Sequence, residues 1–149
     1  MQKPISIRQA SVHDIPVMIE ICKNTFIESA RHSAVAINIF RAAFTGHPGW
    51  QWVAEMDGAV AGFIVCNRNE TEGFANINLI GVDPCAKGTG IGGKLLDVLE
   101  KHTAASRLNL VRLGTPYART FYEKYGYTCA KIDEKYVIEL VGKPLPPLP

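Results

Sequence analysis

The residues best suited to chemistry lie between positions 82 and 94, where Gly88, Gly90, Gly92 and Gly93 follow a β-rich run that ends at Val82. An amphipathic helical pattern begins directly after them. Glycine lets backbone N–H groups approach a ligand closely. A helix N-terminus adds unpaired N–H groups and about half a positive charge. The segment therefore predicts a site for a phosphate or pyrophosphate group, and with it a phosphorylated cofactor.

Two nucleotide-binding patterns fit this segment only in part. The glycines satisfy the spacing G-x-G-x-x-G, but five residues separate them from Val82, and no acidic residue stands near position 108, where a dinucleotide fold needs one. Residues 88–94 also fit G-x-x-x-x-G-K, but Leu95 replaces the Ser or Thr that holds Mg²⁺ in a P-loop. A mononucleotide or dinucleotide binder is thus an alternative hypothesis that the sequence supports poorly.

Three segments resemble the GNAT superfamily of N-acetyltransferases. The glycine loop is similar to the acetyl-CoA pattern V-x-P-x-x-[QR]-x-x-G-x-[GA], and residues 118–127 resemble the pattern A-x-x-[FL]-Y-E-[KR]-x-G-[FY]. A weaker similarity covers residues 7–14, the first strand and helix start of the family. In the loop the matching residues are Val82, Pro84, Gly90 and Gly92, with Lys87 at the Gln or Arg position. The segments follow the family's order and span residues 5 to about 139.

The resemblance implies acetyl-CoA as acetyl donor, a primary amine as acceptor, and no metal. Tyr122 matches the family tyrosine placed near the CoA sulfur, and a phenol with a pKa near 10 can protonate a departing thiolate; the alternative is a core tyrosine. Gly81 would suit a bulge or a close backbone approach to the cofactor, or would relieve packing against an aromatic neighbour. The residues expected to bind the cofactor are Ile80, Gly81, Val82, Lys87, Gly88, Thr89, Gly90, Ile91, Gly92, Gly93 and Thr115.

Two departures from the family pattern bear on the mechanism. Thr115 stands where many members have Asn, although it can still donate a hydrogen bond to the cofactor. The catalytic Glu that some members carry on the fourth or fifth strand is missing, since Asn76 and Asn78 occupy the polar positions of the fourth strand. A base could come from a water chain or from Glu28, Glu70 or Glu72. A catalytically silent CoA-binding sensor or partner module of the same fold is therefore the alternative hypothesis.

The acceptor pocket in this family is shaped by the first helices and the hairpin, which makes Phe26, Arg31, Trp50 and Trp52 the candidates here. Alternation places the two tryptophans on the same strand face, and a core role is expected for at least one of them. The acceptor itself, a small-molecule amine or a peptide, stays open.

Composition sets the broad class. The 149 residues are 47% hydrophobic and 20% charged, as expected of one soluble globular domain. A net charge of +2 makes no case for nucleic acid, and no apolar run approaches the 18 residues of a membrane span. Four separate cysteines without metal-ligand spacing favour a reducing, cytoplasmic setting.

Periodicity predicts an α+β (mixed α/β) domain over residues 1–141 and a proline-rich tail over 142–149. The element order is β-α-α-β-β-β-α-β-α-β-β, with a hairpin turn at Asp57-Gly58 and a mostly antiparallel central sheet flanked by helices. This order is also that of the family. Because family members often pair through sheet edges or C-terminal strands, a homodimer is a further expectation of the resemblance.

Overall fold

The computed structural model describes residues 4–25, 29–115, 119–132 and 138–141, so the tail predicted for 142–149 lies outside the described residues. The predicted order of helices and strands is confirmed, with short 3-10 turns added before α1 and α3. The elements are β1 (Ile5–Gln9), α1 (Ile15–Thr25), α2 (Ser29–Gly46), β2 (Gln51–Met56), β3 (Ala59–Asn69), β4 (Phe74–Val82), α3 (Ile91–Ala105), β5 (Leu110–Thr115), α4 (Arg119–Glu123), β6 (Thr128–Ile132) and β7 (Ile138–Val141).

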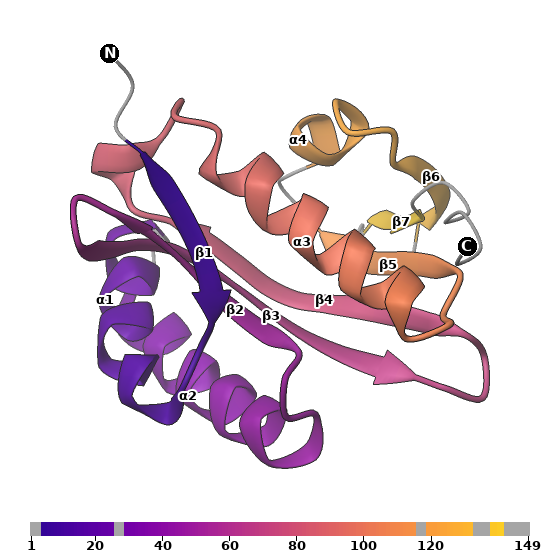
Figure 1. Ribbon diagram of the computed structural model, residues 1–149, viewed down its shortest axis with the longest axis horizontal. Helices are drawn as coiled ribbons and strands as arrows, with labels where there is room; N and C mark the ends of the chain where they lie inside the picture. Colours follow the sequence, from indigo (N-terminus) through magenta and orange to yellow (C-terminus); the bar gives the residue numbers. More distant parts are fainter. Residues whose placement is uncertain (1–3, 26–28, 116–118, 133–137, 142–149) are drawn as a thin grey trace.

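All described strands belong to one sheet, in the order β1-β2-β3-β4-β5-β7-β6. The pair β4–β5 is parallel, and the other neighbouring pairs are antiparallel, which confirms the predicted mixed sheet. Helix α3 lies across one face of the sheet, while α1 and α2 cover the other face (Figure 1). The parallel pair is joined through α3, as parallel strands require a crossover.

The hydrophobic core has two parts, one on each face of the sheet. Trp52, Ile64 and Ile77 pack with α3 on one face, whereas Val53, Phe63 and Val65 pack with α1 and α2 on the other. Successive side chains of a strand point to opposite faces, so both faces of β2 and β3 can be buried at once. This explains why these strands are apolar almost without interruption rather than alternating with polar residues.

The turn between β2 and β3 follows the prediction. Met56 pairs with Ala59, and the two residues between them have positive φ, 56° at Asp57 and 76° at Gly58. Positive φ at both positions defines the type I′ turn, which Asp-Gly favours. The turn thereby sets the register in which β2 meets β3 at this end of the hairpin.

The sheet opens between β4 and β5. Their pairing runs from Phe74/Leu110 to Ile77/Leu113 and stops there in the described residues, although β4 continues to Val82. At the same level the β3–β4 register shifts, because Val65 lies opposite Leu79 whereas Cys66 lies opposite Ile77. The extra residue is Asn78, so a β-bulge bends β4 where the two strands part.

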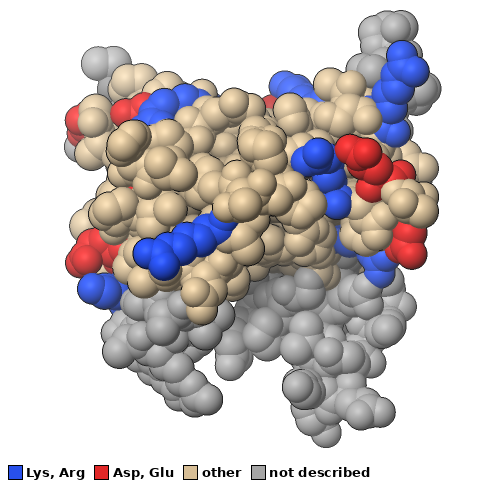
Figure 2. All heavy atoms as spheres, turned by 90° about the horizontal axis from the view of Figure 1, so that it is seen from below, with Lys and Arg blue, Asp and Glu red and all other residues tan. Residues whose placement is uncertain are grey.

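The charges of the molecule are mixed on the face seen in Figure 2. Lys and Arg are interspersed with Asp and Glu there, and the described residues on that face form no broad patch of one sign. Among the helices of the described ranges, none has the length and hydropathy that a bilayer crossing demands.

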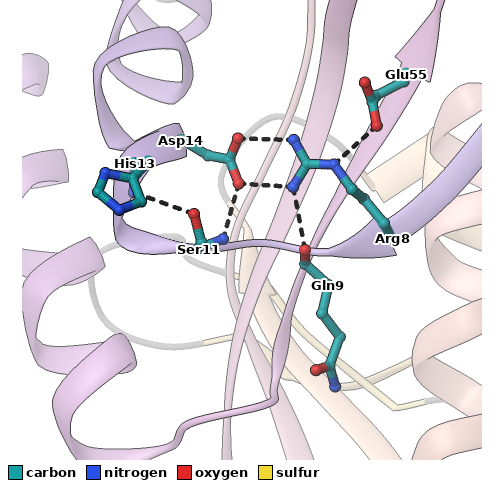
Figure 3. A network of polar contacts seen from close by, with 6 residues as sticks. All are labelled: Arg8, Gln9, Ser11, His13, Asp14 and Glu55. Atoms are coloured by element: carbon teal, nitrogen blue, oxygen red, sulfur yellow. Dashed lines mark hydrogen bonds and ion pairs between the residues drawn. The ribbon is translucent and has the colours of Figure 1, made fainter.

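A polar network holds β1 to the start of the first helix (Figure 3). The Arg8 guanidinium donates two hydrogen bonds of 2.9 and 2.8 Å to the Asp14 carboxylate and one of 2.7 Å to Glu55 on β2. Asp14 also accepts from the Ser11 N–H, and the Ser11 hydroxyl accepts from the His13 N–H, which completes a capping box. These contacts lower the pKa of the Asp14 carboxyl, and the hydrogen bonds from Arg8 have the largest effect. Ser11 is thus the N-cap of the 3-10 turn Val12–Asp14 that leads into α1.

Replacing Asp14 by Asn should lower the free energy of unfolding by about 1–2 kcal/mol at pH 7, since a buried charge-assisted pair is lost while Arg8 stays half exposed. A lowered carboxyl pKa contributes stability above its unfolded value of about 4, and this contribution is lost as the pH falls through the folded value. Urea unfolding at pH 7 and pH 3 should therefore show that the difference in free energy of unfolding between wild type and Asp14→Asn is smaller at pH 3.

The control is Glu70→Gln, which removes the partner of Arg68 at a carboxylate that is 74% exposed. It should change stability by less than about 0.5 kcal/mol. A gap between wild type and Asp14→Asn that stays constant from pH 7 to pH 3 would contradict the assigned role of Asp14.

Candidate active site

The glycine loop forms the N-terminus of α3, as predicted. Gly88 and Gly90 have φ of 82° and 89°, in the left-handed region, and a Cβ at either would meet no atom within 4 Å. Gly90 is the N-cap of α3 and makes no side-chain cap. The N–H groups of Gly90, Ile91, Gly92 and Gly93 find no acceptor in the part of the chain that the structure describes, and the first helical bond is Lys94 N–H to the Gly90 carbonyl. The loop therefore presents free donors and a positive helix end.

A pocket of about 650 Å³ lies over these donors. Residues 86–93 line one side of it, Val82 lines it at the end of β4, and α4 and the turn that follows the helix supply Phe121, Lys124 and Tyr125. The volume lies in the range of small-molecule and cofactor sites. The predicted cofactor residues from Lys87 to Gly93, together with Val82, thus come together around one cavity.

The other two glycines of the loop are explained by packing. A Cβ at Gly92 would lie 2.7 Å from the Phe121 ring, and a Cβ at Gly93 would lie 2.5 Å from the Tyr125 hydroxyl. Both distances are too short for a side chain, so these positions admit α4 onto the first turn of α3. Gly88 and Gly90 serve the backbone conformation, whereas Gly92 and Gly93 serve the contact between two helices.

Three pocket residues of α4 and its following turn, Phe121, Lys124 and Tyr125, are absent from the predicted set. They are separated by three and four positions, as residues on one side of a helical turn are, and that spacing was the available signal. Lys124 places its ammonium 5.5 Å from the centre of the Tyr125 ring, beside the loop. The predicted residue Lys87 also lines the pocket.

Tyr122 points away from this pocket toward the core. It is 3% exposed, stacks on Phe121 with ring centres 5.0 Å apart, and lies 5.7 Å from the Tyr127 ring. Burial, and secondarily the Cys66 thiol, raise the pKa of Tyr122 well above its ordinary value. Tyr122 and Cys66 share the core on this face, and Cys66 lies opposite Ile77, the last residue of β4 that pairs with β5 in the described sheet. Tyr122 is both a core residue and a neutral phenol next to the opening.

The end of β4 needs one correction. Ile80 is half-buried and Gly81 is buried; the bulge is at Asn78, not at Gly81. A Cβ at Gly81 would lie 2.6 Å from the Phe63 ring, so the glycine relieves packing against an aromatic neighbour. The backbone of this strand end still faces the opening between β4 and β5, because its only described strand partner there is β3.

The two tryptophans share a face, as predicted, but both lie in the core. Trp50 and Trp52 are each 4% exposed, and their rings lie 4.5 and 5.1 Å from the ring of His102 near the C-terminal end of α3. His102 is eleven residues along α3 from Ile91, about 17 Å. Their placement does not support the predicted contact with an acceptor.

The remaining predicted positions are described in part. Phe26 and Glu28 lie outside the described residues. Arg31 belongs to α2 and Thr115 to the end of β5, opposite Ile138, and the side chains of both are outside the description.

The carboxylates considered as bases on the β3–β4 turn lie near the start of β4. Glu70 pairs with Arg68, and Glu72 is exposed. The opening begins after Ile77, about 10 Å along β4 from Phe74, and no described contact joins either carboxylate to it. Their placement therefore does not support a role as general base.

The free cysteines have different environments. Of the described cysteines, Cys22 and Cys66 are buried in the core and Cys85 is exposed. Within the described ranges, no group of three or more His, Cys, Asp or Glu side chains is arranged to hold a metal ion.

The start of α3, with its free N–H donors, lies beside the opening of a mixed sheet. The acetyltransferase (GNAT) domain family matches residues 48–129, more than half of the chain, and the chain belongs to this family. The crystal structure of the PaiA N-acetyltransferase from Thermoplasma acidophilum in complex with coenzyme A has the same fold, with a TM-score of 0.78 and 18% identity over 94% of this chain and 99% of that chain.

Two curated relatives are similar in sequence. A 5-NmdU N-acetyltransferase of Pseudomonas phage PaMx11 is 33% identical over 93 residues, 62% of this chain and 66% of the phage protein. A mycothiol acetyltransferase of Streptomyces griseus is 28% identical over an alignment that covers 83% of this chain and 48% of the relative. The chain thus spans about two thirds of the first relative and about half of the second.

The contact between α3 and α4 can be tested by a double-mutant cycle. Gly92→Ala should lower the free energy of unfolding by about 1–3 kcal/mol, because the new Cβ overlaps the Phe121 ring. In a Phe121→Ala background the same change should cost less than half as much, since the ring is gone. Denaturant unfolding of the four proteins measures the coupling, and strictly additive effects would contradict the assigned contact.

Proposed function

We propose that this protein transfers the acetyl group of acetyl-CoA to a primary amine. The observation that carries the proposal is the pocket over free N–H donors of α3, next to the opening between β4 and β5. Family membership agrees with this reaction.

The residues present fit coenzyme A. The N–H groups of residues 90–93 and the positive end of α3 would hold the pyrophosphate. Lys87 and Lys124 would add positive charge on two sides of the pocket. The edge of β4 at Ile80, Gly81 and Val82 would offer backbone groups to the pantetheine arm, because those groups have no β5 partner there. Thr115 at the end of β5 is proposed as a further hydrogen-bond donor to the cofactor.

In the reaction, the neutral amine attacks the thioester carbonyl carbon and a C–N bond forms. The C–S bond then breaks, the thiolate takes a proton from Tyr122, and the surplus proton of the amine passes to water. Tyr122 is suited to this step because burial keeps the phenol protonated across the working pH range. The phenol is afterwards reprotonated from solvent. The described residue at the β4 bulge is Asn78 and not a carboxylate, so the proposed route for the amine proton is a water chain.

The acceptor is a small-molecule amine or a peptide, and Phe26 and Arg31 are proposed to contact it. The named relatives act on a 5-NmdU substrate and in mycothiol acetylation, which are different compounds. Their names therefore do not select an acceptor for this chain.

A second function is favoured by one observation. The polar residue at the bulge is Asn78 rather than a carboxylate, so the chain could bind CoA as a sensor or partner module without turnover. The two functions predict the same cofactor binding and differ in whether thiol is released from acetyl-CoA when amines are added.

Thermal unfolding with acetyl-CoA, CoA, NAD and ATP tests the cofactor. A ligand at 100 times its Kd should stabilise the protein by about 2.7 kcal/mol, and we expect this for acetyl-CoA and CoA alone. Gly90→Asp should abolish the shift, because Gly90 has positive φ and a carboxylate there would repel a pyrophosphate. Gly58→Asp is the control, a glycine of positive φ on the β2–β3 turn. A thermal shift with NAD or ATP, and none with acetyl-CoA or CoA, would contradict the proposed cofactor.

Tyr122→Phe tests the acid. It should lower turnover about 100-fold, the scale for loss of a general acid, while the CoA-induced thermal shift persists. Tyr127→Phe is the matched control, a second buried tyrosine whose ring lies 5.7 Å from that of Tyr122, and it should retain turnover because no proton transfer is assigned to it. Thiol release from acetyl-CoA measures both. Equal rates for wild type and Tyr122→Phe would remove Tyr122 from the mechanism.

A further inference from the structure

Three asparagines meet at the bulge of β4. The Asn78 side-chain oxygen accepts a hydrogen bond of 2.8 Å from the Asn67 amide on β3 and another of 2.8 Å from the Asn76 amide on β4. All three residues are half-buried. Three neutral carboxamides at one point of a sheet are not needed for its pairing, so their arrangement calls for a role.

The cluster lies on the face of the sheet opposite Tyr122. Cys66, Ala75 and Ile77 belong to the core beneath α3, as does Tyr122. Since neighbouring side chains of a strand point to opposite faces, Asn67 and Asn76 face the side of α1 and α2. Their hydrogen bonds place the Asn78 side chain on that same side.

The asparagine cluster lies at the position along β4 where the sheet opens. Ile77 is the last residue of β4 that pairs with β5 in the described sheet, and Asn78 follows it directly. On the proposed function, the thioester lies in this opening with Tyr122 on one side. An amine that attacks from the other side passes Asn78.

The hydrogen bonds determine what Asn78 offers to such an amine. A carboxamide oxygen has two lone pairs, and both are occupied by the amides of Asn67 and Asn76. The N–H₂ group of Asn78 makes no hydrogen bond to any other described residue. Asn78 therefore presents donors and no acceptor, so it can neither take a proton from an ammonium group nor accept a hydrogen bond from one.

We propose that Asn78 is a specificity-determining residue that binds a carbonyl or carboxylate oxygen carried by the acceptor beside its amine. The acceptor class is then an α-amino carbonyl compound rather than a plain alkyl amine. Asn67 and Asn76 are positioning residues that hold the Asn78 carboxamide with its N–H₂ group outward. This inference rests on the proposed acetyl transfer and narrows its acceptor.

The test compares two probes of similar size, glycinamide and propylamine, by the ratio of their kcat/KM values with acetyl-CoA. Wild type should favour glycinamide. Asn78→Ala should reduce the ratio about tenfold, the effect of one hydrogen bond made to only one of the probes. Asn78→Asp should reduce it further, because a carboxylate keeps the bonds from Asn67 and Asn76 but repels the probe's oxygen. Dividing the ratio of each variant by that of wild type cancels the different amine pKa values of the probes, so the change in the ratio is the decisive readout.

Controls separate a binding role from a structural one. Asn109→Ala removes an exposed asparagine at the far end of the sheet, hydrogen-bonded through its backbone to Gly73, and should leave the ratio unchanged. Asn67→Ala and Asn76→Ala should each lower the ratio by less than Asn78→Ala, since each leaves one bond to the Asn78 oxygen. A merely structural cluster would lower turnover of both probes alike and leave the ratio at the wild-type value.

The outcomes distinguish this inference from the proposed function. A wild-type protein that shows the CoA-induced thermal shift but favours propylamine, treats the probes equally or uses neither would overturn the role of Asn78 alone. Absence of the CoA shift would instead overturn the proposed function. An unchanged ratio in both Asn78→Ala and Asn78→Asp, with the CoA shift retained, would also refute the inference.

Discussion

The separation of β4 from β5 is the constraint on which the rest of the site depends. A strand buried in the middle of a sheet normally pairs on both sides along its whole length, and unpaired backbone groups in the interior are unfavourable. Here β4 keeps its β3 partner throughout but leaves β5 after Ile77, where the extra residue Asn78 bends it. The backbone groups that face the opening then become available to a ligand, so the binding edge and the bulge are one feature.

The contact between α3 and the α4 segment forms one wall of the pocket beside this opening. Without a side chain at Gly92 and Gly93, the rings of Phe121 and Tyr125 approach the first turn of α3. At the end of α4, Gly126 has a φ of 92°, and the N–H of Tyr127 returns to the Tyr122 carbonyl, a C-terminal cap that directs the chain into β6. The segment of α4 and its following turn therefore supplies a pocket wall and a positive charge on one side and the buried phenol of Tyr122 on the other.

Local patterns in the sequence were sufficient for the elements and for the loop, because hairpin turns, helical periodicity and glycine spacing act over a few residues. Asp57-Gly58 and the donors at the start of α3 are examples. The tryptophans show where this reasoning ends: alternation places Trp50 and Trp52 on one face but does not say that α3 covers that face. The position of the bulge and the pocket contribution of Lys124 likewise depend on partners distant in sequence, namely β3 for the first and the loop for the second.

The burial of Tyr122 is compatible with both of its predicted roles, a core tyrosine and a general acid. A phenol that packs on Phe121 and Tyr127 is a core residue, and the same packing removes water from around its hydroxyl. Desolvation disfavours the phenolate, so the proton is held firmly until an anion forms next to it. A thiolate leaving in a dry site is such an anion, and it is poorly stabilised there unless a donor is already in place. Burial that makes Tyr122 structural in the resting protein thus also makes it suited to give its proton only when the C–S bond breaks.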